Sequence, residues 1–191
     1  MKNLIRPAIT LFILISFVTG LLYPLAVTGI AQIAFPEQAT GSLMKRGEEV
    51  IGSSLIGQSF SGPAYFWGRP SATSPMPYNA ANSGGSNLGP TNPVLIEAVN
   101  ERIKNLHTSH PGNEKKIPTD LVTTSASGLD PHISPAAAYY QVERVAAARN
   151  TDAAIVKMLI DQSIETPQWG LLGDSRVNVL RLNLALDALE K

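Results

Sequence analysis

An apolar run near the N-terminus is the strongest constraint on how this chain can fold. Between Arg6 and Glu37 the sequence PAITLFILISFVTGLLYPLAVTGIAQIAFP has no ionisable side chain except that of Tyr23. About 20 helical residues cross the roughly 30 Å hydrocarbon core of a bilayer, so this run is long enough to span one. A secretory signal peptide would have a shorter apolar region, roughly 7–15 residues, followed by a clean cleavage site. The run therefore predicts one uncleaved transmembrane helix over residues 7–35.

The charges that flank this run predict its orientation. Lys2 and Arg6 lie directly before it, whereas Glu37 follows it. Cytoplasmic flanks of membrane spans carry an excess of Lys and Arg. We therefore expect residues 1–6 in the cytoplasm and residues 36–191 outside it, in the periplasm of a bacterium with an inner membrane.

The composition excludes several functional classes. The chain has 191 residues, of which 44% are apolar, and this suits one globular domain with an additional element. Its formal net charge is zero, so it lacks the basic balance of a nucleic-acid-binding protein. It contains no cysteine, which excludes disulfide scaffolds, thiolate zinc sites and cysteine nucleophiles.

A long segment rich in Gly, Pro, Ser and Asn covers residues 68–93. Its sequence, GRPSATSPMPYNAANSGGSNLGPTNP, is incompatible with a continuous helix or a central strand. A loop of this length in a compact domain is usually either functional or disordered. Tyr78, Asn79 and Asn87 supply polar contacts, so we expect an ordered contact loop and regard these three residues as candidates for partner docking.

The rest of the chain reads as a mixture of strands and helices. Residues 41–66 predict two or three short strands separated by turns. Helix-start signals and apolar spacing predict three helices, from Asn92-Pro93 to about Leu106, from Ser134-Pro135 to Asn150, and from Thr151-Asp152 to Pro167. We expect a short extended piece at 120–123, then a C-terminal strand followed by a helix capped by Asn183. The soluble part is therefore predicted to be one α+β domain.

The stretch TTSASGLDPHISP, residues 123–135, carries the residue types of a hydrolase triad. Ser125, Ser127, Asp130 and His132 lie within a few positions of one another. A nucleophile elbow requires G-x-S-x-G, and neither serine has glycines at both flanking positions. A membrane-anchored extracytoplasmic hydrolase that uses Ser125 or Ser127 with His132 remains the alternative function.

The backbone of the same stretch favours a structural interpretation. Pro131 favours an extended conformation at Asp130, and on that basis we expect the Asp130 and His132 side chains to point to opposite sides. The stretch then forms a turn at Gly128, a rigid Asp-Pro step and a helix cap at Ser134.

Two further motifs predict no site. His107 and His110, with His132 as a third ligand, resemble a metal site only weakly, because no carboxylate accompanies them at a suitable spacing. The glycine-rich SGGSNLGP, residues 83–90, lacks the Lys and hydroxyl residue of a phosphate-binding P-loop.

Several longer blocks follow the apolar run in order. They are GSSLIGQSF, YFWGRPSAT, YNAANSGGSNLGPTNP, DLVTTSASGLDPHIS, QVERVAAAR and RVNVLRLNLALDAL. In these blocks the chain closely resembles the C subunit of the bacterial Kdp potassium-transporting P-type ATPase, over nearly its whole length. The resemblance implies an accessory, non-catalytic, single-pass inner-membrane subunit that high-affinity potassium uptake needs for assembly and activity. It implies three partners, a channel-like A subunit, an ATP-hydrolysing B subunit and a small F subunit, and no cofactor of the chain's own, since the complex handles ATP and potassium.

The resemblance also implies a nucleotide-related role for one residue. The family's C subunit is described as a catalytic chaperone that raises the ATP affinity of the ATPase subunit, with a helix glutamine contacting the nucleotide. Gln141 corresponds to that glutamine, and we expect Gln141 and Arg144 to point outward from their helix. The predicted topology opposes direct contact, because P-type ATPases bind ATP in the cytoplasm and Gln141 lies beyond a membrane about 30 Å thick. Any effect on ATP affinity would then be a coupling free energy transmitted through the complex. A nucleotide-binding regulator that acts on the cytoplasmic side remains a further alternative function.

Overall fold

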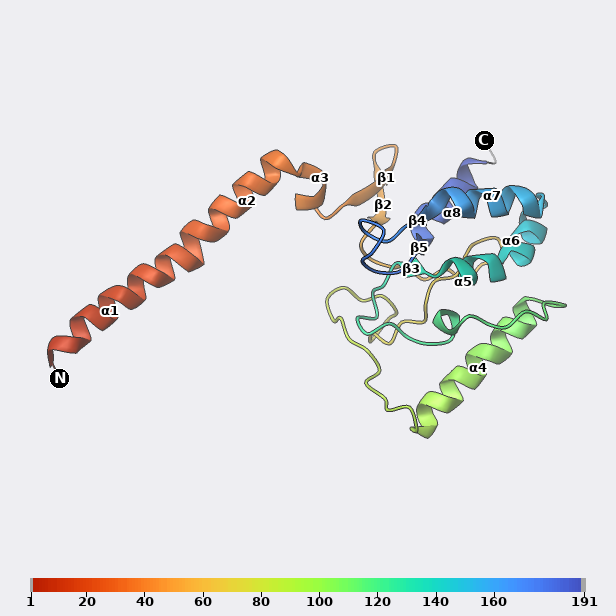
Figure 1. The fold of residues 1–191 in the computed structure, drawn as a ribbon, viewed down its shortest axis with the longest axis horizontal. Coiled ribbons are helices and arrows are strands. Elements are labelled where there is room, and N and C mark those ends of the chain that lie inside the picture. The colour runs from red at the N-terminus through yellow and green to blue at the C-terminus, as the bar shows by residue number, and fades with distance from the viewer. Residues whose placement is uncertain (1, 190–191) are drawn as a thin grey trace. The chain divides into compact units, whose positions relative to one another are not determined.

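The chain divides into two units, Met1–Ser53 and Ser54–Lys191, in a computed structural model that describes residues 2–189 (Figure 1). Met1, the first residue of the predicted segment 1–6, lies outside the described residues. Residues 190–191, the last of the predicted segment 36–191, lie outside them too. Helices accompany two small sheets, so the predicted α+β class is confirmed.

The first unit begins with a long apolar helix. It consists of α1 (Lys2–Phe17), the π-helical turn η1 (Val18–Leu22) and α2 (Tyr23–Ala34). The continuous stretch Leu4–Ala34 has 31 residues and a mean hydropathy of 2.1, so it is long and apolar enough to cross a membrane. The π-helical turn ends two residues before Pro24, and a proline inside a helix removes an N–H that would pair with a carbonyl of the preceding turn.

A short helix and a hairpin complete the first unit. They are α3 (Pro36–Ala39), β1 (Leu43–Arg46) and β2 (Glu49–Ser53), and the two strands pair antiparallel. Gly47 occupies the turn with φ of 64°, a conformation that favours glycine. The region 41–66 therefore contains two strands, and residues 54–92, all of them described, contain neither helix nor strand.

The second unit carries the remaining elements. They are α4 (Pro93–Ser109), the 3₁₀ turn η2 (Thr119–Leu121), β3 (His132–Ile133), α5 (Pro135–Tyr140), α6 (Val142–Arg149), α7 (Ala153–Ser163), β4 (Ile164–Glu165), β5 (Arg176–Asn178) and α8 (Val179–Ala188). Three of the predicted helix starts are confirmed by capping bonds, since side-chain oxygens of Asn92, Ser134 and Asp152 accept from the backbone of the first turn.

The small sheet has β5 at its centre, with the antiparallel order β3-β5-β4. Residue Val177 of β5 pairs with Ile133 on one side and with Ile164 on the other. This arrangement brings His132 and Glu165, which are distant in the sequence, to the two sides of one strand. Helices α5 to α8 pack with this sheet around the core, whose fully buried side chains include Phe66, Val142, Val145, Val156, Ile160, Val177, Leu182 and Leu186.

The predicted continuous helix from 135 to 150 is wrong, because Gln141 interrupts it. Gln141 has φ of −91° and ψ of −7° and separates α5 from α6. Its side chain turns toward the backbone of Trp67 and bonds it. A tertiary contact therefore overrides a stretch with strong helix propensity.

Three boundaries also differ from the prediction. Residues 119–121 form a 3₁₀ turn where an extended piece was expected at 120–123. Helix α7 ends at Ser163, before Pro167, because the chain enters β4. Helix α8 is capped by Asn178, and the predicted cap Asn183 lies inside the helix with only 2% of its surface exposed.

Candidate functional site

The turn at residues 124–130 is held together by its own serine side chains. Ser125 Oγ accepts a hydrogen bond from Gly128 N at 2.9 Å, and Ser127 Oγ accepts one from Leu129 N at 3.1 Å. Local bonds of this kind between hydroxyl and backbone are typical of turns. Gly128 has φ of 67°, so the predicted turn at this glycine is confirmed.

The same turn fastens the contact loop, residues 68–93. Ser71 Oγ donates to Gly128 O at 2.7 Å, and Gly84 N donates to Ser127 O at 2.9 Å. A Cβ added at Gly128 would lie only 2.8 Å from Gly84 O, so the two segments approach too closely for a larger residue. We call these two bonds the loop clamp. They give the long loop a defined attachment to the rest of the second unit.

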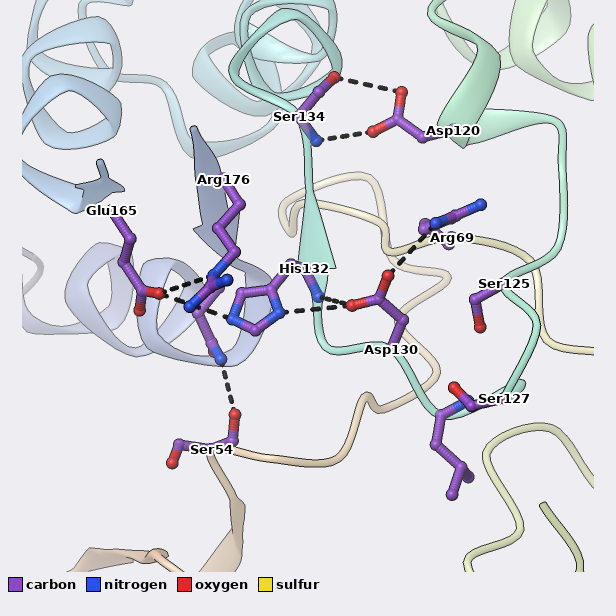
Figure 2. A network of polar contacts seen from close by, with 12 residues as sticks. Ser54, Arg69, Asp120, Ser125, Ser127, Asp130, His132, Ser134, Glu165 and Arg176 are labelled. Carbon is purple, nitrogen blue, oxygen red and sulfur yellow. Dashed lines mark hydrogen bonds and ion pairs between the residues drawn. The ribbon is translucent and has the colours of Figure 1, made fainter. Parts of the chain in front are cut away.

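Asp130 joins the end of this turn to β3 (Figure 2). His132 Nδ1 lies 3.3 Å from Asp130 Oδ1, which also accepts from His132 N at 3.0 Å. Arg69 Nη1 lies 3.3 Å from the other carboxylate oxygen. The prediction that Asp130 and His132 point to opposite sides is therefore wrong, because side chains two residues apart in extended backbone share a face. Burial alone would raise the pKa of Asp130, but the hydrogen bonds from His132 and the charge of Arg69 outweigh it and hold this pKa below its usual range.

A second carboxylate, Glu165 of β4, faces the opposite edge of the His132 ring (Figure 2). Glu165 Oε2 lies 3.8 Å from His132 Nε2 and 3.0 Å from Arg176 Nε, and its Oε1 lies 3.3 Å from Arg181 Nη1. An open pocket of about 650 Å³ adjoins this network, lined by Arg69, Asp120, Asp130, His132, Asp174 and Arg176 among others. Acidic and basic groups both line it, and the carboxylates of Asp130 and Glu165 are paired with cationic side chains within the network.

The network does not assemble the proposed hydrolase. Both ring nitrogens of His132 face carboxylates, and both serine hydroxyls accept from the backbone of their own turn. Figure 2 shows Asp130 between His132 and the turn that carries Ser125 and Ser127. Among residues 2–189, no hydrogen bond joins either hydroxyl to His132. The nucleophile–base contact that defines such a site is missing, and the hydrolase alternative gains no support.

The three histidines occupy different environments. His107 lies on the exposed face of α4, His110 is the buried C-cap of that helix, and His132 belongs to the network just described. Over the described part of the chain, no group of three or more His, Asp or Glu side chains has a geometry suited to a metal ion.

Gln141, the residue implicated in nucleotide contact, is fully buried, with 0% of its surface exposed. Its Oε1 accepts from Trp67 N at 2.8 Å and from Arg144 Nη2 at 2.7 Å, and its Nε2 donates to Trp67 O at 3.1 Å and to Ala137 O at 3.2 Å. The expectation that Gln141 and Arg144 point outward is wrong. All four of these bonds connect the Gln141 amide to other residues inside the domain.

Arg144 extends this buried cluster. Its guanidinium lies 4.1 Å above the Trp67 ring, its Nε donates to His110 Nε2 at 3.0 Å, and its Nη1 donates to Tyr65 O at 3.0 Å. Burial lowers the pKa of Arg144 to about 10. Burial also lowers the pKa of His110, and the nearby Arg144 charge acts in the same direction. Sequence reasoning missed this cluster because its members come from separate segments, with no spacing that signals their contact.

The chain is similar to known proteins over almost its whole length. Residues 5–188 match the family model described as KdpC, the K+-transporting ATPase c chain. The chain belongs to the KdpC family. A potassium-transporting ATPase KdpC subunit of Dechloromonas aromatica (strain RCB) is 61% identical over 191 residues, which is all of both chains. Those of Polaromonas naphthalenivorans (strain CJ2) and Variovorax paradoxus (strain S110) are 61% and 60% identical, covering 100% and 98% of this chain and 97% of each relative.

Within this KdpC-family chain, the three docking candidates differ in their roles. Tyr78 Oη donates to Arg69 O, and burial raises the pKa of Tyr78 to about 12. Asn79 Nδ2 donates to Ser74 O, so Tyr78 and Asn79 both support the loop internally. Asn87 is exposed and adopts φ of 51°. Of these three residues, Asn87 alone is exposed, whereas Tyr78 and Asn79 are half-buried, and docking through this loop stays a prediction.

Proposed function

We propose that this chain is a non-catalytic accessory subunit of an ATP-driven potassium uptake complex. The observation that carries the proposal is the match to the KdpC family over residues 5–188. The arrangement of the candidate site supports the same function, because the serines of the hydrolase alternative serve as supports for the contact loop. The chain then contributes a binding surface to the pump and no reacting group.

The proposed partners are a channel-like A subunit, an ATP-hydrolysing B subunit and a small F subunit. We assign docking to the contact loop, residues 68–93, with Asn87 as an exposed contact. The loop clamp supports this assignment, since a surface that is already ordered loses less conformational entropy on binding.

The proposed topology has a cytoplasmic N-terminus, one span and the second unit outside the cytoplasm. Lys2 and Arg6, in the first turns of the apolar helix, support it. Protease added to intact spheroplasts is expected to digest the second unit, and inverted vesicles are expected to protect it. Digestion only in inverted vesicles would reverse the orientation and restore direct access to cytoplasmic ATP.

Any effect on ATP affinity is then proposed to be transmitted through the complex. The buried, fully bonded amide of Gln141 supports an indirect route, because a nucleotide contact would require those internal bonds to break. Calorimetric titration of the purified full chain with ATP is expected to show no binding. Saturable binding that disappears in Gln141→Glu, without loss of thermal stability, would establish direct contact.

Deletion of the chain tests the function as a whole. Without it, the complex is expected to assemble poorly or to lose potassium-stimulated ATP hydrolysis, and both should return when the wild-type chain is restored. A pump that runs normally without the chain would contradict the proposal. The double variant Ser125→Ala, Ser127→Ala tests the hydrolase alternative. If that alternative held, the variant would lose a hydrolase activity of the chain and would still assemble with the pump.

A further inference from the structure

The loop between β4 and β5 presents an apolar tip made of Trp169, Leu171 and Leu172. These side chains are 84%, 86% and 54% exposed, respectively. The first two values exceed those of every other large apolar side chain described in residues 54–189. Exposed apolar groups gathered at one place mark an interaction surface more often than scattered ones do.

The tip is held in one conformation by backbone hydrogen bonds. Gln168 and Leu172 exchange bonds, with Gln168 N donating to Leu172 O at 2.9 Å and Leu172 N donating to Gln168 O at 3.0 Å. Strands β4 and β5 continue this pairing at the base of the loop. The tip therefore resembles a preformed binding element, which pays little ordering entropy when a partner covers it.

The backbone of Trp169, at the tip, adopts a conformation that is unfavourable for a bulky side chain. Trp169 has φ of 55° and Gly170 has φ of 73°, with Leu171 N donating to Gln168 O at 3.2 Å. These φ angles suit a type I′ turn, whose first central position favours Asn, Asp or Gly over a bulky side chain. Strained backbone of this kind clusters at functional sites such as ligand clamps. The turn therefore carries Trp169 although this backbone conformation disfavours a bulky residue.

Charge around the tip favours a protein over a lipid surface. Residues 163–175 contain Glu165 and Asp174 and no Lys or Arg. The nearest cations along the chain, Arg176 and Arg181, are already paired with Glu165. Segments that insert into anionic membranes combine apolar side chains with free basic ones, and this loop lacks the basic ones.

We propose that the apolar tip is a docking anchor that inserts into an apolar recess on another subunit of the potassium pump. This inference rests on the proposed function, since it requires partner subunits. An exposed Trp on a hydrogen-bonded turn has the properties of an interface hot spot, in which one aromatic anchor fills a pocket. The tip is separate from the contact loop, so it adds a second, apolar attachment point.

Replacing Trp169 by Asn separates docking from folding. Asn favours positive φ, so Trp169→Asn is expected to leave the melting temperature of the full chain unchanged or to raise it. The same variant is expected to weaken association with the other pump subunits about thirtyfold, the typical cost of losing a hot-spot anchor. Met158→Gln is the matched control, because Met158 is an exposed apolar residue of α7. Unchanged association of Trp169→Asn would overturn the proposal.

A cysteine probe identifies what covers the tip. The chain has no natural cysteine, so Leu171→Cys gives it a single alkylation site, and Lys157→Cys on α7 gives an exposed control. Each full-length variant is purified in lipid nanodiscs, alone and within the complex, and its alkylation by a maleimide is timed. We expect the Leu171→Cys variant to react rapidly as the isolated chain and slowly in the complex, and the Lys157→Cys control to react rapidly in both.

The other outcomes each overturn the inference. Rapid reaction of Leu171→Cys in both samples would mean that no partner covers the tip. Slow reaction in both would mean that lipid or a second copy of the chain covers it. A wild-type chain that fails to co-purify with the pump subunits would contradict the proposed function itself. A chain that co-purifies while its tip stays reactive would contradict only this inference.

Discussion

Gln141 and Trp67 are joined by two reciprocal hydrogen bonds, in which the side-chain amide of one pairs with the backbone N–H and C=O of the other. Asn183 makes the same kind of pair with the backbone of Phe66. Two buried side-chain amides thus bond the backbone N–H and C=O groups of two consecutive residues, Phe66 and Trp67, in a segment that belongs to no sheet. This arrangement explains why a chain without regular structure over residues 54–92 can enter the core.

Gln141→Leu tests this arrangement through stability. Leucine has a similar volume but leaves the Trp67 backbone and one Arg144 donor without their partner, so the free energy of unfolding should fall by about 2 kcal/mol. Denaturant unfolding of the full chain measures this loss. Gln162→Leu, at an exposed position of α7, is the matched control and should change the stability little. Equal stability of Gln141→Leu and wild type would show that the paired bonds contribute nothing net.

His110 should make the stability depend on pH. Burial, together with the Arg144 charge, lowers its pKa in the folded chain below the ordinary value of 6.5. The unfolded chain therefore binds more protons at this site as the pH falls below about 6.5, and the folded state is destabilised there. Above that pH the contribution is fully present.

Melting temperatures at pH 8 and pH 5.5 test this dependence. The wild-type chain should lose more stability on acidification than His110→Phe, which keeps an aromatic ring beside Trp67 and Tyr140 but cannot be protonated. His107→Asn, at an exposed position of the same helix, is the control. A fall in melting temperature as large in His110→Phe as in wild type would assign the pH dependence to other groups.

Ser71→Ala should loosen the contact loop without unfolding the domain. Ser71 Oγ donates to Gly128 O and accepts from Tyr78 N, so its removal costs about 1 kcal/mol and frees the base of the loop. Hydrogen exchange should accelerate at the amides of Tyr78 and Gly84. Ser86→Ala, an exposed serine of the same loop, should leave both exchange rates unchanged. Equal exchange in the two variants would show that the loop clamp does not depend on this hydroxyl.

Asn178→Ala should destabilise the C-terminal helix and the start of the second unit together. Its Oδ1 accepts from Arg181 N at the start of α8, and its Nδ2 donates to Ser54 O at 2.8 Å. Loss of a helix cap and of one buried bond should lower the free energy of unfolding by about 2 kcal/mol. Asn178→Ser is the comparison, because serine can still cap the helix but cannot reach Ser54, so its loss should be smaller.

Local signals in the sequence predicted the elements, whereas long-range bonds determined the site. The apolar helix and the caps at Asn92, Ser134 and Asp152 follow from neighbouring residues, and the structure confirms them. The break at Gln141 results from bonds to a residue 74 positions away in the chain. No helix periodicity carries that information, because propensity reports only on nearby residues.

The serine-rich turn shows the same division. Its spacing correctly argued against a nucleophile elbow, but it could not reveal that Ser127 and Gly128 hold a loop from another part of the chain. The contact between Asp130 and His132 was predictable from strand geometry, since alternate residues share a face. The apolar tip at Trp169 was not, because Trp is uncommon in the turn conformation it adopts.

The loop clamp has a consequence for ionic strength. Its two bonds join neutral groups, a hydroxyl and an amide to backbone carbonyls, so dissolved salt does not screen them. The nearby pair of Arg69 and Asp130 is partly exposed and weakens as salt rises. The contact loop should therefore keep its shape from dilute to concentrated media while its charged surroundings loosen. For a subunit proposed to lie outside the cytoplasm, the geometry of the proposed docking loop should then not depend on the salt concentration around it.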